Sequence, residues 1–127
     1  MSQLHVVDTS AWLEYFADSP RASLFAEVIE DTGHLIVPVI ALYEVFKWTL
    51  RECGLAAAEA ARQQMKRGRI IPLDEDLIIA AASLKMPLAD NLIYAVAKAH
   101  QATLWTQDAH FDGLPNVRYF PKPNLES

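Results

Sequence analysis

Four carboxylates in this sequence have the residue type and the setting that metal-dependent chemistry requires. They are Asp8, Glu44, Asp90 and Asp108, and each follows, precedes or interrupts an apolar segment. A charge beside a buried segment costs free energy unless another group compensates it. Carboxylates gathered within a few Å repel one another, and a hard divalent cation would neutralise them. We therefore predict that the four side chains form one acidic site that binds a divalent metal.

The expected chemistry of such a site is phosphoryl transfer. Mg²⁺ and Mn²⁺ prefer oxygen ligands and leave several coordination positions to water and to substrate phosphate. A bound cation lowers the pKa of a water molecule, orients it for attack on phosphorus and stabilises the departing oxygen. Zinc chemistry is not expected, because the single cysteine, Cys53, stands alone and the histidines are scattered. The histidines are His5, His34, His100 and His110.

Each carboxylate also has a simpler structural interpretation. Asp8 could cap a helix that begins near Ser10, although Thr9 and Ser10 could serve as caps instead. Glu44 lies inside an expected helix and could pair with Lys47, three residues further on. The two remaining aspartates could cap the helix and the turn that follow them. Single positions are therefore ambiguous, and their combination is what favours a metal site.

Alternating strands and helices are expected to position these residues. We expect strands at residues 4–7, 34–37, 69–72, 102–106 and 117–120. We expect helices at residues 10–16, 21–30, 39–52, 55–67, 91–101 and, from a cap at Asp74 or Asp76, to about residue 85. This alternation predicts an α/β fold with a parallel sheet covered on both faces, in which ligands bind beyond the carboxyl ends of the strands. Asp8 and Asp108 each follow a strand and so belong to that rim.

Length and composition narrow the class of protein. The 127 residues suit a single domain over residues 1–127, with a short tail at about 121–127. No apolar run reaches the roughly 18 residues of a membrane span, and residues 1–20 lack the pattern of a secretory signal. One cysteine fits a reducing, cytoplasmic setting. The net charge of −5 disfavours nucleic-acid binding, but cations bound at four carboxylates would offset most of it.

Four short motifs, in this order and spacing, resemble those of the PIN domain family, and most closely the small VapC-type toxins of toxin–antitoxin pairs. The first two are Val7-Asp8-Thr9-Ser10 and the segment from Pro38 to Val45 that contains Glu44. The others are the segment from Leu88 to Ala97 that contains Asp90, and the segment from Leu104 to Phe111 that contains Asp108. The resemblance covers nearly the whole chain.

The resemblance implies a three-layer α/β/α sandwich with a mainly parallel, roughly five-stranded sheet. It also implies an endoribonuclease that needs Mg²⁺ or Mn²⁺ and cuts single-stranded RNA. By position, Asp8, Glu44, Asp90 and Asp108 take the family's acidic catalytic roles, with Asp8, Asp90 and Asp108 as the expected metal ligands. Homodimers, silencing by a cognate antitoxin protein and toxin–antitoxin hetero-oligomers are implied as well.

Supporting roles are expected at four further positions. The resemblance assigns supporting hydroxyl groups to Ser10 and Thr106. Asn91 stands where family members often have a small residue, and its amide could hydrogen-bond substrate or a metal-bound water. Asp112 lies on the same turn as Asp108 and is an expected auxiliary ligand.

Two other functions are compatible with the same residues. A catalytically weak PIN-like module could use the acidic rim to bind a basic protein partner. A metal-dependent phosphatase on a similar scaffold could hydrolyse a small phosphate ester. A phospho-aspartate mechanism is disfavoured, because it needs a second aspartate two residues after the first, and this chain has Ser10 there.

Overall fold

The computed structural model describes residues 3–123 and contains five short parallel strands. They are β1 (His5–Val7), β2 (Ile36–Pro38), β3 (Arg69–Ile71), β4 (Thr103–Thr106) and β5 (Val117–Tyr119). β4 pairs with β1 and β5, and β2 pairs with β3. A parallel bridge between His5 and Leu35 joins the two groups, which gives the order β3-β2-β1-β4-β5. The expected five-stranded parallel sheet is confirmed.

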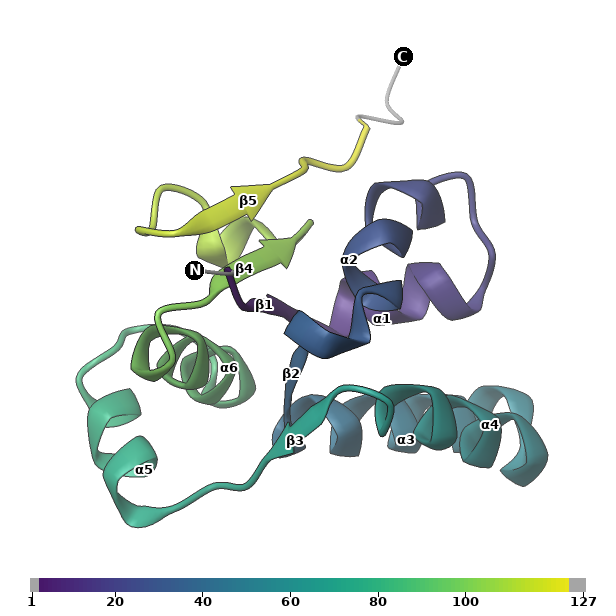
Figure 1. The fold of residues 1–127 in the computed structure, drawn as a ribbon, viewed down its shortest axis with the longest axis horizontal. Coiled ribbons are helices and arrows are strands. Elements are labelled where there is room, and N and C mark those ends of the chain that lie inside the picture. Colours follow the sequence, from purple (N-terminus) through teal and green to yellow (C-terminus); the bar gives the residue numbers. More distant parts are fainter. Residues whose placement is uncertain (1–2, 124–127) are drawn as a thin grey trace.

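Helices flank the strands on two sides (Figure 1). The α-helices are α1 (Thr9–Phe16), α2 (Ala26–Glu30), α3 (Val39–Cys53), α4 (Leu55–Met65), α5 (Glu75–Ala82) and α6 (Leu88–Ala99). Three 3₁₀ turns are η1 (Ala22–Leu24), η2 (Thr32–His34) and η3 (Ala109–Phe111). In Figure 1, α5 and α6 lie on one side of the strands and α1 and α2 on the other, while α3 and α4 run side by side.

The core forms where the apolar strands meet α1 and α6. Val6 and Val7 of β1 and Leu104 of β4 are fully buried between the helices. Trp12 of α1 is buried against them, and six successive residues of α6, 92–97, are buried as well. A helix that is apolar on almost every face must lie inside the molecule. α6 therefore holds its amino end, and Asp90 with it, in a fixed place beside the sheet.

The helices expected at residues 21–30 and 91–101 have different bounds in the structure. The single helix expected at 21–30 is divided into η1 and α2, because Phe25 between them turns into the core and packs edge-on against Phe120. α6 begins at Leu88, three residues before the expected start, directly after Pro87. Proline suits the start of a helix because its missing N–H is not needed there. This earlier start places Asp90 in the first turn of α6.

Of the two caps expected for α5, Asp74 or Asp76, the structure has Asp74. Its carboxylate accepts a hydrogen bond from the Leu77 N–H at 2.9 Å. α5 itself ends at Ala82, earlier than expected. None of the helices within residues 3–123 has the length and apolar character that crossing a bilayer demands. The expected tail at about 121–127 lies mostly outside the described residues.

Candidate metal centre

Asp8 stands at the junction between β1 and α1. It is the N-cap of α1 and is only 3% exposed. Its carboxylate accepts a hydrogen bond from the Ala11 N–H at 3.3 Å and contacts the Ser10 hydroxyl at 3.0 and 3.2 Å. Of the two caps that the sequence allowed, Asp8 is therefore the one present, and the alternative of Thr9 or Ser10 is wrong. Ser10 instead contacts the Asp8 carboxylate directly.

The buried position of Asp8 shifts its titration. The pKa of Asp8 is raised to about 7, chiefly by burial and in a smaller part by the negative charge of Asp108, while hydrogen bonds from Ser10, Thr106 and Ala11 act in the opposite direction. Burial disfavours the charged form of a carboxyl group, and a nearby negative charge has the same effect. The Asp8 carboxylate would therefore gain from a cation placed next to it.

Glu44 points from α3 toward α1. Its carboxylate accepts a hydrogen bond from the Thr9 hydroxyl, so the ion pair with Lys47 is not the contact that holds it. Lys47 lies over the Tyr43 ring instead, 5.6 Å from the ring centroid. The negative charge of Glu44 also contributes to raising the pKa of Asp90. Glu44 thus belongs to the same electrostatic environment as the aspartates.

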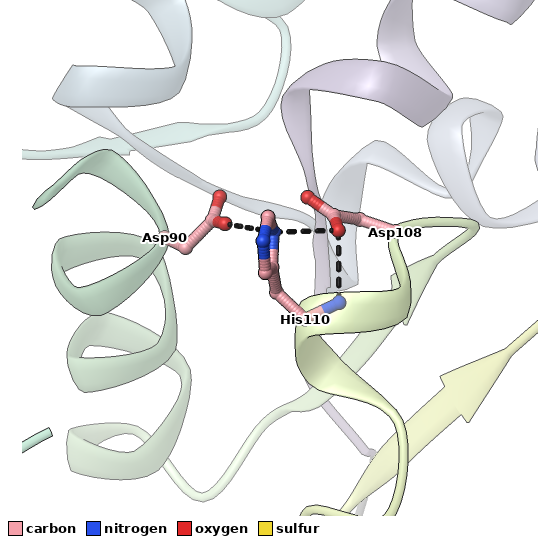
Figure 2. A group of neighbouring side chains, drawn as sticks. All are labelled: Asp90, Asp108 and His110. Atoms are coloured by element: carbon pink, nitrogen blue, oxygen red, sulfur yellow. Dashed lines mark hydrogen bonds and ion pairs between the residues drawn. The ribbon is translucent and has the colours of Figure 1, made fainter. Parts of the chain in front are cut away.

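Asp90 and Asp108 face each other across the ring of His110 (Figure 2). The His110 Nδ1 atom lies 3.0 Å from Asp90 Oδ2 and 2.9 Å from Asp108 Oδ1. One ligand atom from each of the three residues lies within 4.8 Å of the other two. These three side chains come from the first turn of α6, from the N-cap of η3 and from η3 itself. The group could therefore bind a metal ion.

The electrostatics of this group follow from its crowding. The pKa of Asp90 is raised to about 6, chiefly by burial and then by the charges of Asp108 and Glu44, while His110 acts to lower it. The hydrogen bond and the charge of Asp108, helped by Asp90, raise the pKa of His110. The two carboxylates beside His110 Nδ1 favour a positive charge at this point, carried either by a proton on the ring or by a divalent cation. No role at the site was predicted for His110 from the sequence, and the structure brings it there because it lies two residues after Asp108 on one tight turn.

Thr106 connects the two aspartates that follow strands. Its hydroxyl oxygen accepts a hydrogen bond from the Asp108 N–H at 2.9 Å. The same hydroxyl lowers the pKa of Asp8 through a hydrogen bond. Thr106 is fully buried at the end of β4. It therefore sets the position of Asp108 relative to Asp8.

Two of the expected supporting residues lie elsewhere. The Asn91 amide oxygen accepts a hydrogen bond from the Met86 N–H at 2.9 Å, and its nitrogen donates one to the Leu84 carbonyl at 3.2 Å. Asn91 therefore fastens the loop between α5 and α6 through both ends of its amide, and its expected contact with substrate or metal-bound water stays a prediction. Asp112 is exposed at the end of η3 and is not part of the three-residue group among the described residues.

A buried polar network next to the site was not expected from the sequence. The Gln107 side chain, 4% exposed, donates to Glu14 Oε2 at 2.8 Å and accepts from Arg21 Nε at 2.7 Å. Arg21 Nη2 also donates to the carbonyl oxygens of Phe120 at 2.7 Å and Pro121 at 3.3 Å. The hydrogen bond from Gln107 is the main reason why the pKa of Glu14 is lowered. The network braces the chain immediately before Asp108.

The donor set fits Mg²⁺ or Mn²⁺. Carboxylate oxygens are the ligands that these hard ions prefer, and the raised pKa of the buried Asp8 shows a carboxyl group short of positive charge. The structure groups Asp90 and Asp108 with His110, and the prediction is that Asp8 joins the two aspartates in holding the ion. Their roles in binding and catalysis stay a prediction.

Comparisons with known proteins place this geometry in context. A sequence model of the PIN domain matches residues 5–116. A toxin–antitoxin complex from Klebsiella pneumoniae has a chain that is 20% identical, with a TM-score of 0.78 over 93% of this chain and 99% of the other. VapC20 from Mycobacterium tuberculosis, a toxin that cleaves the sarcin–ricin loop, is 20% identical with a TM-score of 0.74, over 89% and 96% of the two chains.

A third similar structure is VapBC2 from Rickettsia felis bound to a DNA fragment from its promoter. It is 17% identical, with a TM-score of 0.66 over 94% of this chain and 98% of the other. At these identities the likeness establishes the fold. A search of curated protein sequences found no significant match.

Proposed function

The chain belongs to the PIN domain family, and from that premise we propose that it is a metal-dependent endoribonuclease toxin. Its substrate is single-stranded RNA, and its reaction is hydrolysis of a phosphodiester bond. One observation carries the proposal. Carboxylates from α3, from α6 and from the segments that follow β1 and β4 share one electrostatic environment at the carboxyl edge of the sheet, although they are up to 100 positions apart in the sequence.

The side chains would divide the work as follows. Asp8, Asp90 and Asp108 hold Mg²⁺ or Mn²⁺, which when bound supplies a water of lowered pKa and neutralises charge on the phosphate. The hydroxyl groups of Ser10 and Thr106 keep the Asp8 carboxylate in place.

Glu44 is suited to proton transfer. The Thr9 hydroxyl holds the Glu44 carboxylate through Oε1. The Oε2 atom is the one we assign to accept a proton from the attacking water. A base must lie within hydrogen-bond reach of the proton that it takes. Its place beside Asp90 is consistent with that requirement.

The partners follow from the kinds of protein that share the fold. Similar chains have been crystallised in toxin–antitoxin complexes, and we propose a cognate antitoxin protein and a homodimer for this chain, in the cytoplasm. An apolar surface of α3 supports a protein partner, because Leu42, Tyr43, Phe46 and Leu50 line one groove there. Exposed apolar patches of this kind mark interaction sites.

The proposal is tested by incubating purified protein with total RNA and Mg²⁺ or Mn²⁺ and mapping the new RNA ends. We expect discrete cuts that EDTA abolishes. Asp8→Asn should keep the fold, because asparagine is also a good N-cap, and should lose cleavage. Cleavage by Asp8→Asn at the wild-type rate would contradict the assigned site.

The same preparation separates the alternative functions. A folded protein without metal binding in calorimetry and without cleavage would favour a protein-binding module. Hydrolysis of a small phosphate ester without cleavage of RNA would favour a phosphatase. Neither outcome is expected here, because the acidic group combines a buried carboxyl group with a base held by a hydroxyl.

A further inference from the structure

His110 contacts the acidic site through one ring nitrogen (Figure 2). The distances from Nδ1 to Asp90 Oδ2 and Asp108 Oδ1 are 3.0 and 2.9 Å. Neighbouring ligands of an octahedral ion with bonds of ~2.1 Å are about 3 Å apart. The nitrogen and the two oxygens are therefore already separated as two edges of one coordination octahedron.

We propose that His110 is a metal ligand through Nδ1, so that the site has mixed nitrogen and oxygen donors and prefers Mn²⁺ to Mg²⁺. This inference rests on the proposed function, because it concerns the same metal site. It adds a residue that the four carboxylates do not include. It also names which of the two cations the site would select.

The position of the ring is fixed by its own backbone. The His110 N–H donates to Asp108 Oδ1 at 2.9 Å, so the carboxylate that contacts the ring also holds the turn η3 that carries it. Phe111, the next residue, is fully buried and anchors the same turn in the core. The His110 side chain is 55% exposed, which leaves the rest of the ring open to water. The ring can therefore remain at the site while an ion enters.

The preference for Mn²⁺ follows from the chemistry of the donors. Mg²⁺ takes oxygen ligands almost exclusively, whereas imidazole nitrogen suits transition-metal ions. An all-carboxylate site would bind both ions through the same atoms. Replacing one oxygen donor with an imidazole removes an interaction that Mg²⁺ favours and adds one that Mn²⁺ accepts. His110 should therefore widen the difference in affinity between the two ions.

A different role for His110 would be that of a counter-ion only. In that case the protonated ring balances Asp90 and Asp108 in the metal-free protein and moves away when a cation arrives. The two roles differ in one observable property. If His110 is a ligand, its ring nitrogen nucleus is magnetically coupled to the bound ion. If the ring is only a counter-ion that has moved away, this coupling is absent.

The experiment is pulsed electron paramagnetic resonance of the Mn²⁺-loaded protein, with calorimetry of Mn²⁺ and Mg²⁺ binding. The variants are His110→Asn and a matched control, His34→Asn. His34 lies in η2, and its ring also contacts an aspartate, Asp31, at 3.0 Å. We expect a ¹⁴N coupling in wild type and in His34→Asn, and its loss in His110→Asn. The ratio of Mn²⁺ to Mg²⁺ affinity should fall by about tenfold or more in His110→Asn alone, because substitutions at metal sites typically cost about 10- to 100-fold in affinity and this one removes a donor that only Mn²⁺ accepts well.

The outcomes separate this inference from the proposed function. Bound Mn²⁺ without ¹⁴N coupling, no Mn²⁺ binding at all, or an unchanged affinity ratio in His110→Asn would overturn the role of His110. RNA cleavage by that same wild-type protein would leave the proposed function standing. A ¹⁴N coupling in a protein that does not cleave RNA would uphold the ligand and overturn the nuclease.

Discussion

Asp8 serves two purposes at the start of α1. Its carboxylate caps the helix through the Ala11 N–H, and its burial raises its pKa to about 7. An ionised carboxylate can accept the cap hydrogen bond, but the same burial makes that charge costly without a cation. Asp90, with a pKa raised to about 6, has the same conflict. Ionising these two carboxyl groups therefore costs free energy in the metal-free protein, and a bound divalent ion would offset that cost.

The first prediction concerns the stability of the metal-free protein in EDTA. The pKa of Asp8 is raised from 3.8 in the unfolded chain to about 7 in the fold, so between these pH values the folded protein holds a proton that the unfolded chain has lost. Raising the pH through this window favours the unfolded chain, and the free energy of unfolding should fall. Asp8→Asn should make this fall shallower and be more stable than wild type at pH 8 by on the order of a few kcal/mol.

Urea unfolding at pH 4 to 8 in EDTA measures this effect. At pH 4 the Asp8 carboxyl group is mostly protonated in the folded protein. The free energies of unfolding of wild type and Asp8→Asn should therefore differ little at that pH. Equal slopes of unfolding free energy against pH in the two proteins would show that the Asp8 side chain is not the titrating group.

At the scale of elements, the site depends on how the ends of β4, β5 and α1 are joined. Gln107 contacts both Glu14 of α1 and Arg21, and Arg21 reaches the carbonyl oxygens beyond β5. Hydrogen bonds that involve a charged donor and a buried acceptor are worth more than exposed ones. This network holds the segment that carries Asp108 against α1.

The second prediction is that Arg21→Ala loosens this segment. It should lower the free energy of unfolding by roughly 1–3 kcal/mol, because Gln107 and the Phe120 carbonyl lose a charged partner. Arg51→Ala is the matched control, since its ion pair with Glu52 at 3.2 Å is well exposed and contributes less than about 1 kcal/mol. Chemical denaturation of both variants tests the difference, and equal losses would mean that the network does not brace the fold.

The elements and the rim were predictable because their signals are local. Asp8 and Asp108 directly follow apolar runs, so their place at the carboxyl edge followed from a parallel sheet alone. The contact between Arg21 and Gln107 joins residues 86 positions apart, and no local sequence pattern around either residue predicts it. The role of Asn91 depends on Leu84 and Met86 in an irregular loop, where periodicity carries no information. The place of His110 at the site could have been predicted from the sequence, since it lies two residues after Asp108 in the same turn.

For the whole molecule, the effect of the net charge of −5 on RNA binding depends on the bound metal. Long-range repulsion would keep an anionic RNA strand from an acidic rim. A divalent cation bound among Asp8, Asp90 and Asp108 would cancel most of that local negative charge and offer the RNA phosphate a positive ion to contact. The account therefore makes binding of RNA and binding of metal interdependent, and both depend on the carboxylates at the sheet edge.

The most direct measurement is the rate of RNA cleavage in Mn²⁺ by wild type, Asp90→Asn and Asp112→Asn. Asp90 belongs to the acidic group, whereas Asp112 is an exposed aspartate four residues after Asp108 and outside that group. We expect Asp90→Asn to lower the rate by at least about 100-fold, and Asp112→Asn to cleave as wild type does. Equal rates in all three proteins, or no metal-dependent cleavage by wild type, would contradict the claim that this acidic group is the centre of a ribonuclease.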